Sequence, residues 1–114
     1  MSLNPDSTNI PYTLGRLFSV LEDIQSAASP RIKSTIKDQY FNSASFTPGH
    51  IFPILLKLSQ KHLKKLAVGT RINYEKQIRD LADTLPDVYP SRLSLPQQGS
   101  FQLGYYHQTQ KRYE

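Results

Sequence analysis

Residues 52–66 read FPILLKLSQKHLKKL, a leucine-rich run that contains four lysines. At about 100° per residue of an α-helix, the apolar side chains fall on one side and the lysines on the other. The side predicted to be buried consists of Phe52, Leu55, Ser59, Leu63 and Leu66, and the cationic side consists of Lys57, Lys61, Lys64 and Lys65. The run therefore predicts an amphipathic helix with a positive stripe that contains no acid. Such a stripe either keeps the helix solvated or contacts a polyanion.

The surrounding sequence continues the helical pattern. Prolines 11, 30, 48 and 96 suit the first turns of four helices, where the missing N–H has no intrahelical partner to lose. Ser29 and Thr47 suit N-cap positions, and Ser94 with Gln97 suits a capping box. We predict helices at residues 11–28, 30–43, 48–67, 71–85 and 95–112. The predicted fold class is all-α, a compact bundle of about five helices.

The chain has 114 residues, which suits one small domain with a modest core. We expect a flexible N-terminus at residues 1–10 and a single helical-bundle domain at residues 11–114. No run of 18 apolar residues is present, so no membrane is expected as a partner. The N-terminus lacks the pattern of a secretory signal. The absence of cysteine excludes disulfides and thiolate chemistry and is consistent with a reducing, cytoplasmic setting.

The positive charge is concentrated in the middle of the chain. The formal net charge is +5, yet residues 31–79 alone contain ten bases and two acids. Each flanking segment contains more acids than bases. This distribution favours a polyanion such as nucleic acid as a partner. The candidate nucleic-acid-binding residues are Lys33, Lys37, Lys57, Lys61, Lys64 and Lys65, together with Arg31 and Arg71.

The spacing of these bases indicates how they would bind. Lys33 and Lys37 are expected one turn apart on the second helix. Successive lysines of the third helix advance by about 5–6 Å, comparable with the phosphate spacing of an extended strand. Arg71 counts for less, since it can pair with Glu75. Lysine stripes with few exposed aromatic residues nearby favour sequence-independent backbone contacts over base reading or base stacking.

No catalytic or metal-binding constellation is recognisable. His50 and His62 are 12 residues apart on one predicted helix, so their phases do not favour a shared metal site, and hydrogen-bonded structural roles are expected for both. No glycine-rich phosphate loop is present. Gly99 and Gly104 are expected to allow close packing of the fifth helix. We therefore expect no enzymatic activity, no metal and no cofactor.

The fifth predicted helix is apolar on two sides. Phe101 and Tyr105 face one way, while Leu103 and Tyr106 face roughly another. A helix of this kind usually lies between two partners, either within one fold or in another chain. The candidate partner interface consists of Phe101, Tyr105, Tyr106 and His107. The alternative is that all four side chains belong to the internal core.

Four stretches together carry a family resemblance. YTLGRLFSVLEDIQ, IKDQYFNSASFTP, IFPILLKLSQKHLKKL and LSLPQQGSFQLGYYHQ resemble the C-terminal region of the large subunit of type I-C CRISPR Cascade, and the resemblance covers nearly all of residues 11–109. In that family this region is also made separately, by internal translation initiation, and serves as the small subunit. A chain that begins with Met1 just before this region is similar to the free-standing form.

The resemblance implies a compact helical bundle with an architectural, non-catalytic role in a crRNA-guided complex. The implied partners are the Cascade backbone and large subunits, a neighbouring copy of the chain, and the displaced or target DNA strand, with crRNA contacted indirectly. Residues and resemblance together favour contact between the lysine stripe and DNA. The alternative is a purely structural protein-interaction spacer without direct nucleic-acid contact.

Overall fold

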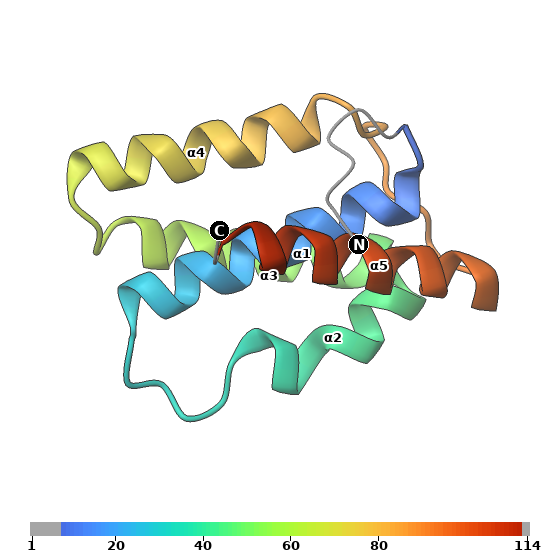
Figure 1. Cartoon of the computed structure of the whole chain (residues 1–114), viewed down its shortest axis with the longest axis horizontal. Helices are drawn as coiled ribbons and strands as arrows, with labels where there is room; N and C mark the ends of the chain where they lie inside the picture. Colours follow the sequence, from blue (N-terminus) through green and yellow to red (C-terminus); the bar gives the residue numbers. More distant parts are fainter. Residues whose placement is uncertain (1–7, 113–114) are drawn as a thin grey trace.

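The chain runs to and fro along the long axis of the molecule, and successive helices point in roughly opposite directions (Figure 1). The computed structural model describes residues 8–112. The helices are α1 (Ile10–Ala28), α2 (Ile36–Phe46), α3 (Pro48–Leu63), α4 (Val68–Ala82) and α5 (Leu95–Lys111). Within the described residues the structure contains no strand. The all-α prediction and the number of helices are confirmed.

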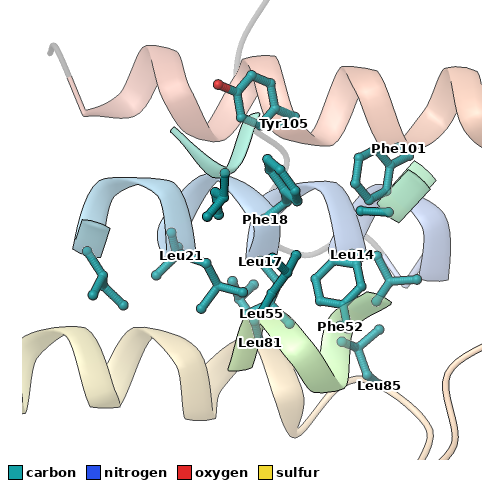
Figure 2. Close-up of a cluster of buried hydrophobic side chains, with 14 of the residues drawn as sticks. Leu14, Leu17, Phe18, Leu21, Phe52, Leu55, Leu81, Leu85, Phe101 and Tyr105 are labelled. Carbon is teal, nitrogen blue, oxygen red and sulfur yellow. The ribbon is translucent and has the colours of Figure 1, made fainter. Parts of the chain in front are cut away.

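Helix α1 forms the centre of the bundle. Thirteen of its 19 residues are buried, and it packs against each of the other four helices. Figure 2 shows Phe18 pointing toward Tyr105 of α5, while Leu17 and Leu21 point toward Leu55 of α3 on the opposite side. A helix that buries two opposite faces needs apolar residues around most of its circumference. The sequence of α1 meets that requirement, whereas α4, which packs chiefly on α1, has Leu81 as its one buried residue.

Helices α1 and α5 approach each other closely at two glycines. A Cβ atom at Gly104 would lie 2.8 Å from the carbonyl carbon of Tyr12 and still closer to its oxygen. A Cβ atom at Gly15 would lie 2.8 Å from the backbone nitrogen of Tyr105. The prediction that Gly104 allows close packing is therefore confirmed. The same prediction for Gly99 is wrong, because a Cβ atom there would meet nothing within 4 Å.

Helix α2 begins six residues later than predicted. Ser29 does not start it; the Ser29 N–H donates to the carbonyl of Gln25 and so closes α1. The side chain of Gln25 then accepts a 2.8 Å hydrogen bond from the backbone N–H of Ile36, the first residue of α2. The backbone N–H of Thr35 donates to Asp38 over 3.0 Å, which completes this N-terminus. Ile32 lies in the connection between α1 and α2 and is 40% exposed.

The turn between α3 and α4 also differs from the prediction. Helix α3 ends at Leu63, not at residue 67, because Lys65 and Leu66 donate to the carbonyls of His62 and Leu63 in a tight turn. Helix α4 consequently starts and ends three residues early. Helix α5 follows the predicted Ser94–Gln97 capping box closely. Most of the predicted flexible N-terminus lies outside the described residues, although its last residue, Ile10, already belongs to α1.

Candidate nucleic-acid interface

Most of the cationic candidates meet at one end of the bundle. Helices α1 and α3 run toward this end and α2 and α4 run away from it, so the connections at residues 29–35 and 64–67 lie at the same end (left in Figure 1). Residues 29–38 and 61–71 contain seven bases and one acid, Asp38. We term this surface the basic end. Its bases are Arg31, Lys33, Lys37, Lys61, Lys64, Lys65 and Arg71.

The predicted lysine stripe of α3 is shorter than expected. Lys57 and Lys61 are exposed on the helix, whereas Lys64 and Lys65 follow its last residue and lie in the turn to α4. The chain must reverse here, so the helical phase does not continue through these two lysines. All four side chains are exposed, and none of them forms a salt bridge within residues 8–112. Their charges therefore face solvent.

The two bases of the first connection are also exposed. Arg31 and Lys33 lie between α1 and α2. The prediction that Lys33 and Lys37 share a helix is wrong, because α2 begins only at Ile36. Both residues nevertheless belong to the basic end, one in the connection and one in the first turn of α2. The contact between Arg71 and Glu75 is confirmed, with 3.9 Å between Nε and Oε1 on an exposed face where such a pair contributes little stability.

Lys37 differs from the other lysines of the basic end because its ammonium group lies against aromatic rings. Its Nζ is 5.2 Å from the ring centre of Tyr105, 5.4 Å from that of Tyr106 and 5.9 Å from that of Phe41. These distances are within the range of cation–π attraction. Lys37 and Tyr106 are far apart in the sequence, so neither spacing nor helical phase could have brought them together in a prediction.

The four residues of the candidate partner interface on α5 differ in how far the structure buries them. Phe101 is fully buried and Tyr105 is 3% exposed, so both belong to the chain's own core and cannot present a surface to a partner. The prediction for these two residues is corrected: both rings pack edge-to-face against Phe18 of α1 and Phe41 of α2. His107 is half-buried, and its Nδ1 lies 2.8 Å from the Tyr12 hydroxyl. Tyr106 is 48% exposed and remains available.

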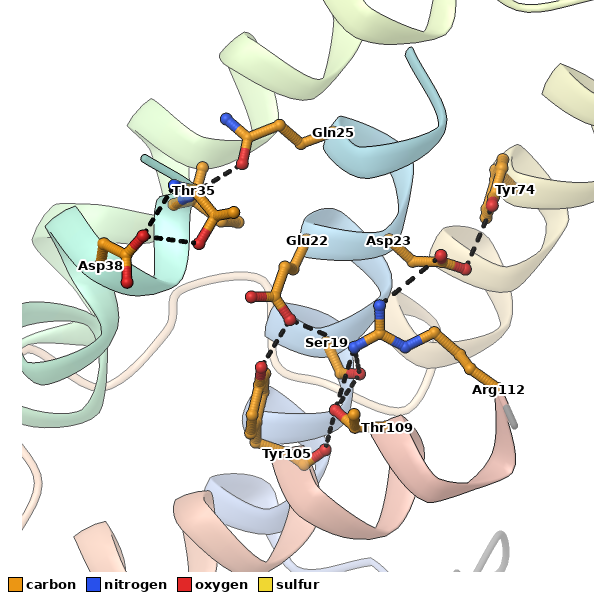
Figure 3. Close-up of polar contacts among 11 residues, drawn as sticks. Ser19, Glu22, Asp23, Gln25, Thr35, Asp38, Tyr74, Tyr105, Thr109 and Arg112 are labelled. Atoms are coloured by element: carbon orange, nitrogen blue, oxygen red, sulfur yellow. Dashed lines mark hydrogen bonds and ion pairs between the residues drawn. The ribbon is translucent and has the colours of Figure 1, made fainter. Parts of the chain in front are cut away.

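A polar network fixes the last turn of α5 against α1 and α4 (Figure 3). The Arg112 guanidinium pairs with Glu22 over 3.1 Å and with Asp23 over 3.5 Å. The Tyr105 hydroxyl donates to Glu22, and the Tyr74 hydroxyl donates to Asp23 over 3.1 Å. The pKa of Tyr74 is raised to about 12, chiefly by burial. The negative charge of Asp23 and the hydrogen bond to its carboxylate raise this pKa further. The charge of Arg112 is therefore neutralised within the fold.

The groove beside this network is less suited to a polyanion than the basic end. It has a volume of about 810 Å³ and lies between α1, α4 and α5. Its lining contains three bases, Arg16, Lys111 and Arg112, and two acids, Asp23 and Asp80. Arg112 is already paired with Glu22 and Asp23, so the groove offers less positive charge to a phosphate group than the basic end does. The basic end, with a single acid that is engaged in the N-terminus of α2, is the better candidate.

His62 lies beside the turn that carries Lys64 and Lys65. Both of its ring nitrogens are buried, and neither has a hydrogen-bond partner within the described residues. The prediction of a hydrogen-bonded structural histidine is therefore wrong for His62. Burial, and secondarily the charge of Lys65, lowers the pKa of the imidazole.

A family model for a CRISPR-associated protein, Cas_Csd1, matches residues 1–113. The chain belongs to the Cas_Csd1 family. A comparison with curated proteins returns no match. The Cas_Csd1 match spans the whole basic end and all of α5, so every candidate binding residue lies inside the region shared with the family. The resemblance to a CRISPR protein, inferred from the four sequence stretches, is confirmed.

Two structural findings concern metal binding and membrane-spanning helices. Within residues 8–112 no group of three or more histidine, aspartate or glutamate side chains is arranged to hold a metal ion. Across the same part of the chain, none of the helices combines the length and apolar character needed to cross a membrane.

Proposed function

We propose that this chain is the non-catalytic small subunit of a cytoplasmic type I-C Cascade complex, in which the basic end holds DNA through sequence-independent backbone contacts. The observation that carries the proposal is the collection of seven bases against one acid at a single end of the bundle. Membership of the Cas_Csd1 family supports a CRISPR-associated role. The type of complex, the subunit role and the DNA contact are the parts that we propose.

The physical basis of the contact is electrostatic. Exposed lysine ammonium groups can neutralise phosphates and release the counterions condensed around them. A contact between lysine and phosphate carries no information about the base, so the affinity should be equal across target sequences. This suits a complex in which base pairing with crRNA reads the sequence. The proposed partners are the Cascade backbone and large subunits, a neighbouring copy of the chain, and the displaced or target DNA strand, with crRNA contacted indirectly.

The test is a triple substitution at the basic end, Lys61→Ala with Lys64→Ala and Lys65→Ala. Each lost phosphate contact should flatten the plot of log affinity against log salt by about 0.7 for single-stranded DNA and about 0.9 for duplex. Three contacts therefore change the slope by roughly 2 to 3. Fluorescence anisotropy across a salt series measures this slope, and assembly of the complex without DNA should be unchanged.

A matched control removes three charges away from the basic end. Lys76 and Arg79 lie on the later turns of α4, and Arg92 lies in the connection between α4 and α5. Their combined replacement by alanine lowers the net charge by the same amount but should leave the salt slope nearly unchanged. Equal effects of the two triple variants, or no effect of the first, would make the basic end an ordinary solvated surface.

The spacer alternative is favoured by one observation. Leu103 and Tyr106 are 42% and 48% exposed on α5, and together they offer a protein partner an apolar contact. On this alternative, Tyr106→Ala lowers the amount of the chain in the assembled complex while its fold stays intact, and the triple lysine variant binds DNA like the wild type.

A further inference from the structure

An exposed aromatic ring stands at the margin of the basic end. Tyr106 projects from α5 with 48% of its surface exposed, and its ring centre lies 5.4 Å from the Nζ of Lys37, a base of that end. Tyr105 supports the ring from within the core: the two ring centres are 5.2 Å apart, and the ring planes are inclined by 76°. Tyr105 is itself fixed by its hydrogen bond to Glu22. The Tyr106 ring is thus held in place next to a cation.

We propose that Tyr106 is a base-stacking platform for single-stranded DNA that runs over the basic end. This inference rests on the proposed function and specifies which form of DNA the surface takes. Stacking on an aromatic side chain is available to every base, so it preserves the sequence independence of the phosphate contacts. In a duplex the bases are already stacked on one another and face inward, so they cannot reach a tyrosine that stands on a protein surface.

The position of Lys37 explains how one site can serve both a base and its phosphate. In the free chain, the ammonium group occupies space beside the rings of Tyr105 and Tyr106. Lysine has a flexible four-carbon stem, so the ammonium can move to a phosphate while the base takes its place against the Tyr106 ring. The attraction of the ring for the cation is exchanged for a contact between unlike charges, and the ring gains a stacked base.

The same lysine disfavours a protein partner on this surface. A partner that covered Tyr106 would also cover the Lys37 ammonium and remove it from water. Burial of an unpaired charge is costly. The acid next to it in sequence, Asp38, is already hydrogen-bonded to Thr35. A phosphate-bearing strand supplies both the compensating charge and the flat apolar surface that the site requires.

The chain contains no tryptophan, so Tyr106→Trp provides a single fluorescent reporter at the site. We expect its emission to be quenched by a short oligothymidine and to change little with a duplex of equal length. Tyr106→Ala should weaken oligothymidine binding by about 5- to 150-fold, the range for loss of one stacked base, with an unchanged salt slope and unchanged duplex affinity. Tyr106→Phe retains the ring and should bind like the wild type.

Leu103→Ala is the matched control, because Leu103 is an exposed apolar residue of the same helix without a ring. It should leave the affinity for oligothymidine unchanged. Equal losses for single-stranded and duplex DNA, or a phenylalanine variant as weak as the alanine variant, would overturn the stacking platform. Normal DNA binding by Tyr106→Ala together with reduced incorporation into the complex would assign the surface to a protein partner and also overturn it.

The outcomes separate this inference from the proposed function. If the triple lysine variant loses binding but Tyr106→Ala does not, the DNA-binding basic end stands and the stacking platform falls. If the wild-type chain binds neither form of DNA, alone or in the complex, both proposals fall.

Discussion

The close approach of α1 and α5 makes Gly104→Ala a sharp test of the fold. The added Cβ would lie 2.8 Å from the carbonyl carbon of Tyr12 and 3.1 Å from its Cα, and closer still to the carbonyl oxygen. Real Cβ atoms essentially never come within 3.0 Å of another heavy atom. These three Tyr12 atoms all belong to the backbone, so no side chain can rotate away to make room. The two helices must move apart.

The cost of that movement can be estimated from what packs between the helices. Phe18 of α1 packs edge-to-face against Phe101 and Tyr105, with ring centres 6.0 and 5.8 Å away. A gap of 0.5–1 Å forfeits a quarter to a half of each dispersion contact, and overpacked cores lose about 1–3 kcal/mol or more. The better helix propensity of alanine returns up to about 1 kcal/mol. We expect a net loss of about 2 kcal/mol and a fall in Tm of roughly 10 °C.

Gly99→Ala is the control within the same helix. Nothing lies within 4 Å of a Cβ atom at this position, so only the propensity gain should remain, up to about 1 kcal/mol of added stability. Urea unfolding and thermal melts followed by far-UV circular dichroism measure both variants. The same substitution at two positions five residues apart should therefore change the stability in opposite directions. Equal stabilities of the two variants would refute the close approach of α1 and α5.

Two further predictions concern stability. Leu21 is 2% exposed in the centre of α1, so Leu21→Ala should cost roughly 2–5 kcal/mol, and an unchanged melting temperature would contradict this role. The pKa of His62 is lowered in the fold, so as pH falls below about 6.5 the unfolded chain binds a proton first and stability declines. His62→Leu should flatten the decline below pH 6.5 in urea titrations, and a variant whose stability falls as steeply as that of the wild type would exclude His62 as a source of acid sensitivity.

The fold class was predictable because its signals are local. The apolar faces of α1 and α3 follow helical periodicity, and the capping box at Ser94 and Gln97 marks the start of α5 within four residues. The start of α2 was missed because Ser29 followed by proline fits a helix start, yet the chain uses Ser29 to end α1. The competing start has a local signal of its own, the capping box of Thr35 and Asp38, and it was overlooked in the sequence. The further hydrogen bond from the backbone N–H of Ile36 to the side chain of Gln25 in α1 has no signature in a single stretch of sequence.

The candidate site was also predictable only in part. The exposure of Lys57 and Lys61 followed from helical phase alone, and the structure places both on the exposed face of α3. The contact of Lys37 with Tyr106 was not predictable, because it depends on how α2 and α5 pack in three dimensions. Neither was the burial of Phe101 and Tyr105, since two-sided apolar character suits a core and an interface equally.

The topology converts a charge bias along the sequence into a charge bias in space. Helix α2 runs away from the connection at residues 29–35, and α3 runs back in the opposite direction. The turn at residues 64–67 therefore lies at the same end of the molecule as residues 29–35. The connection at the other end, between α4 and α5, carries Asp83 and Asp87 against a single base, Arg92. A polyanion therefore attracts one end of the molecule and not the other, which orients the chain before any short-range contact forms. Tyr106 of α5 stands at the margin of this end, with its ring centre 5.4 Å from the Nζ of Lys37, so a strand drawn to the basic end would arrive beside an exposed aromatic ring.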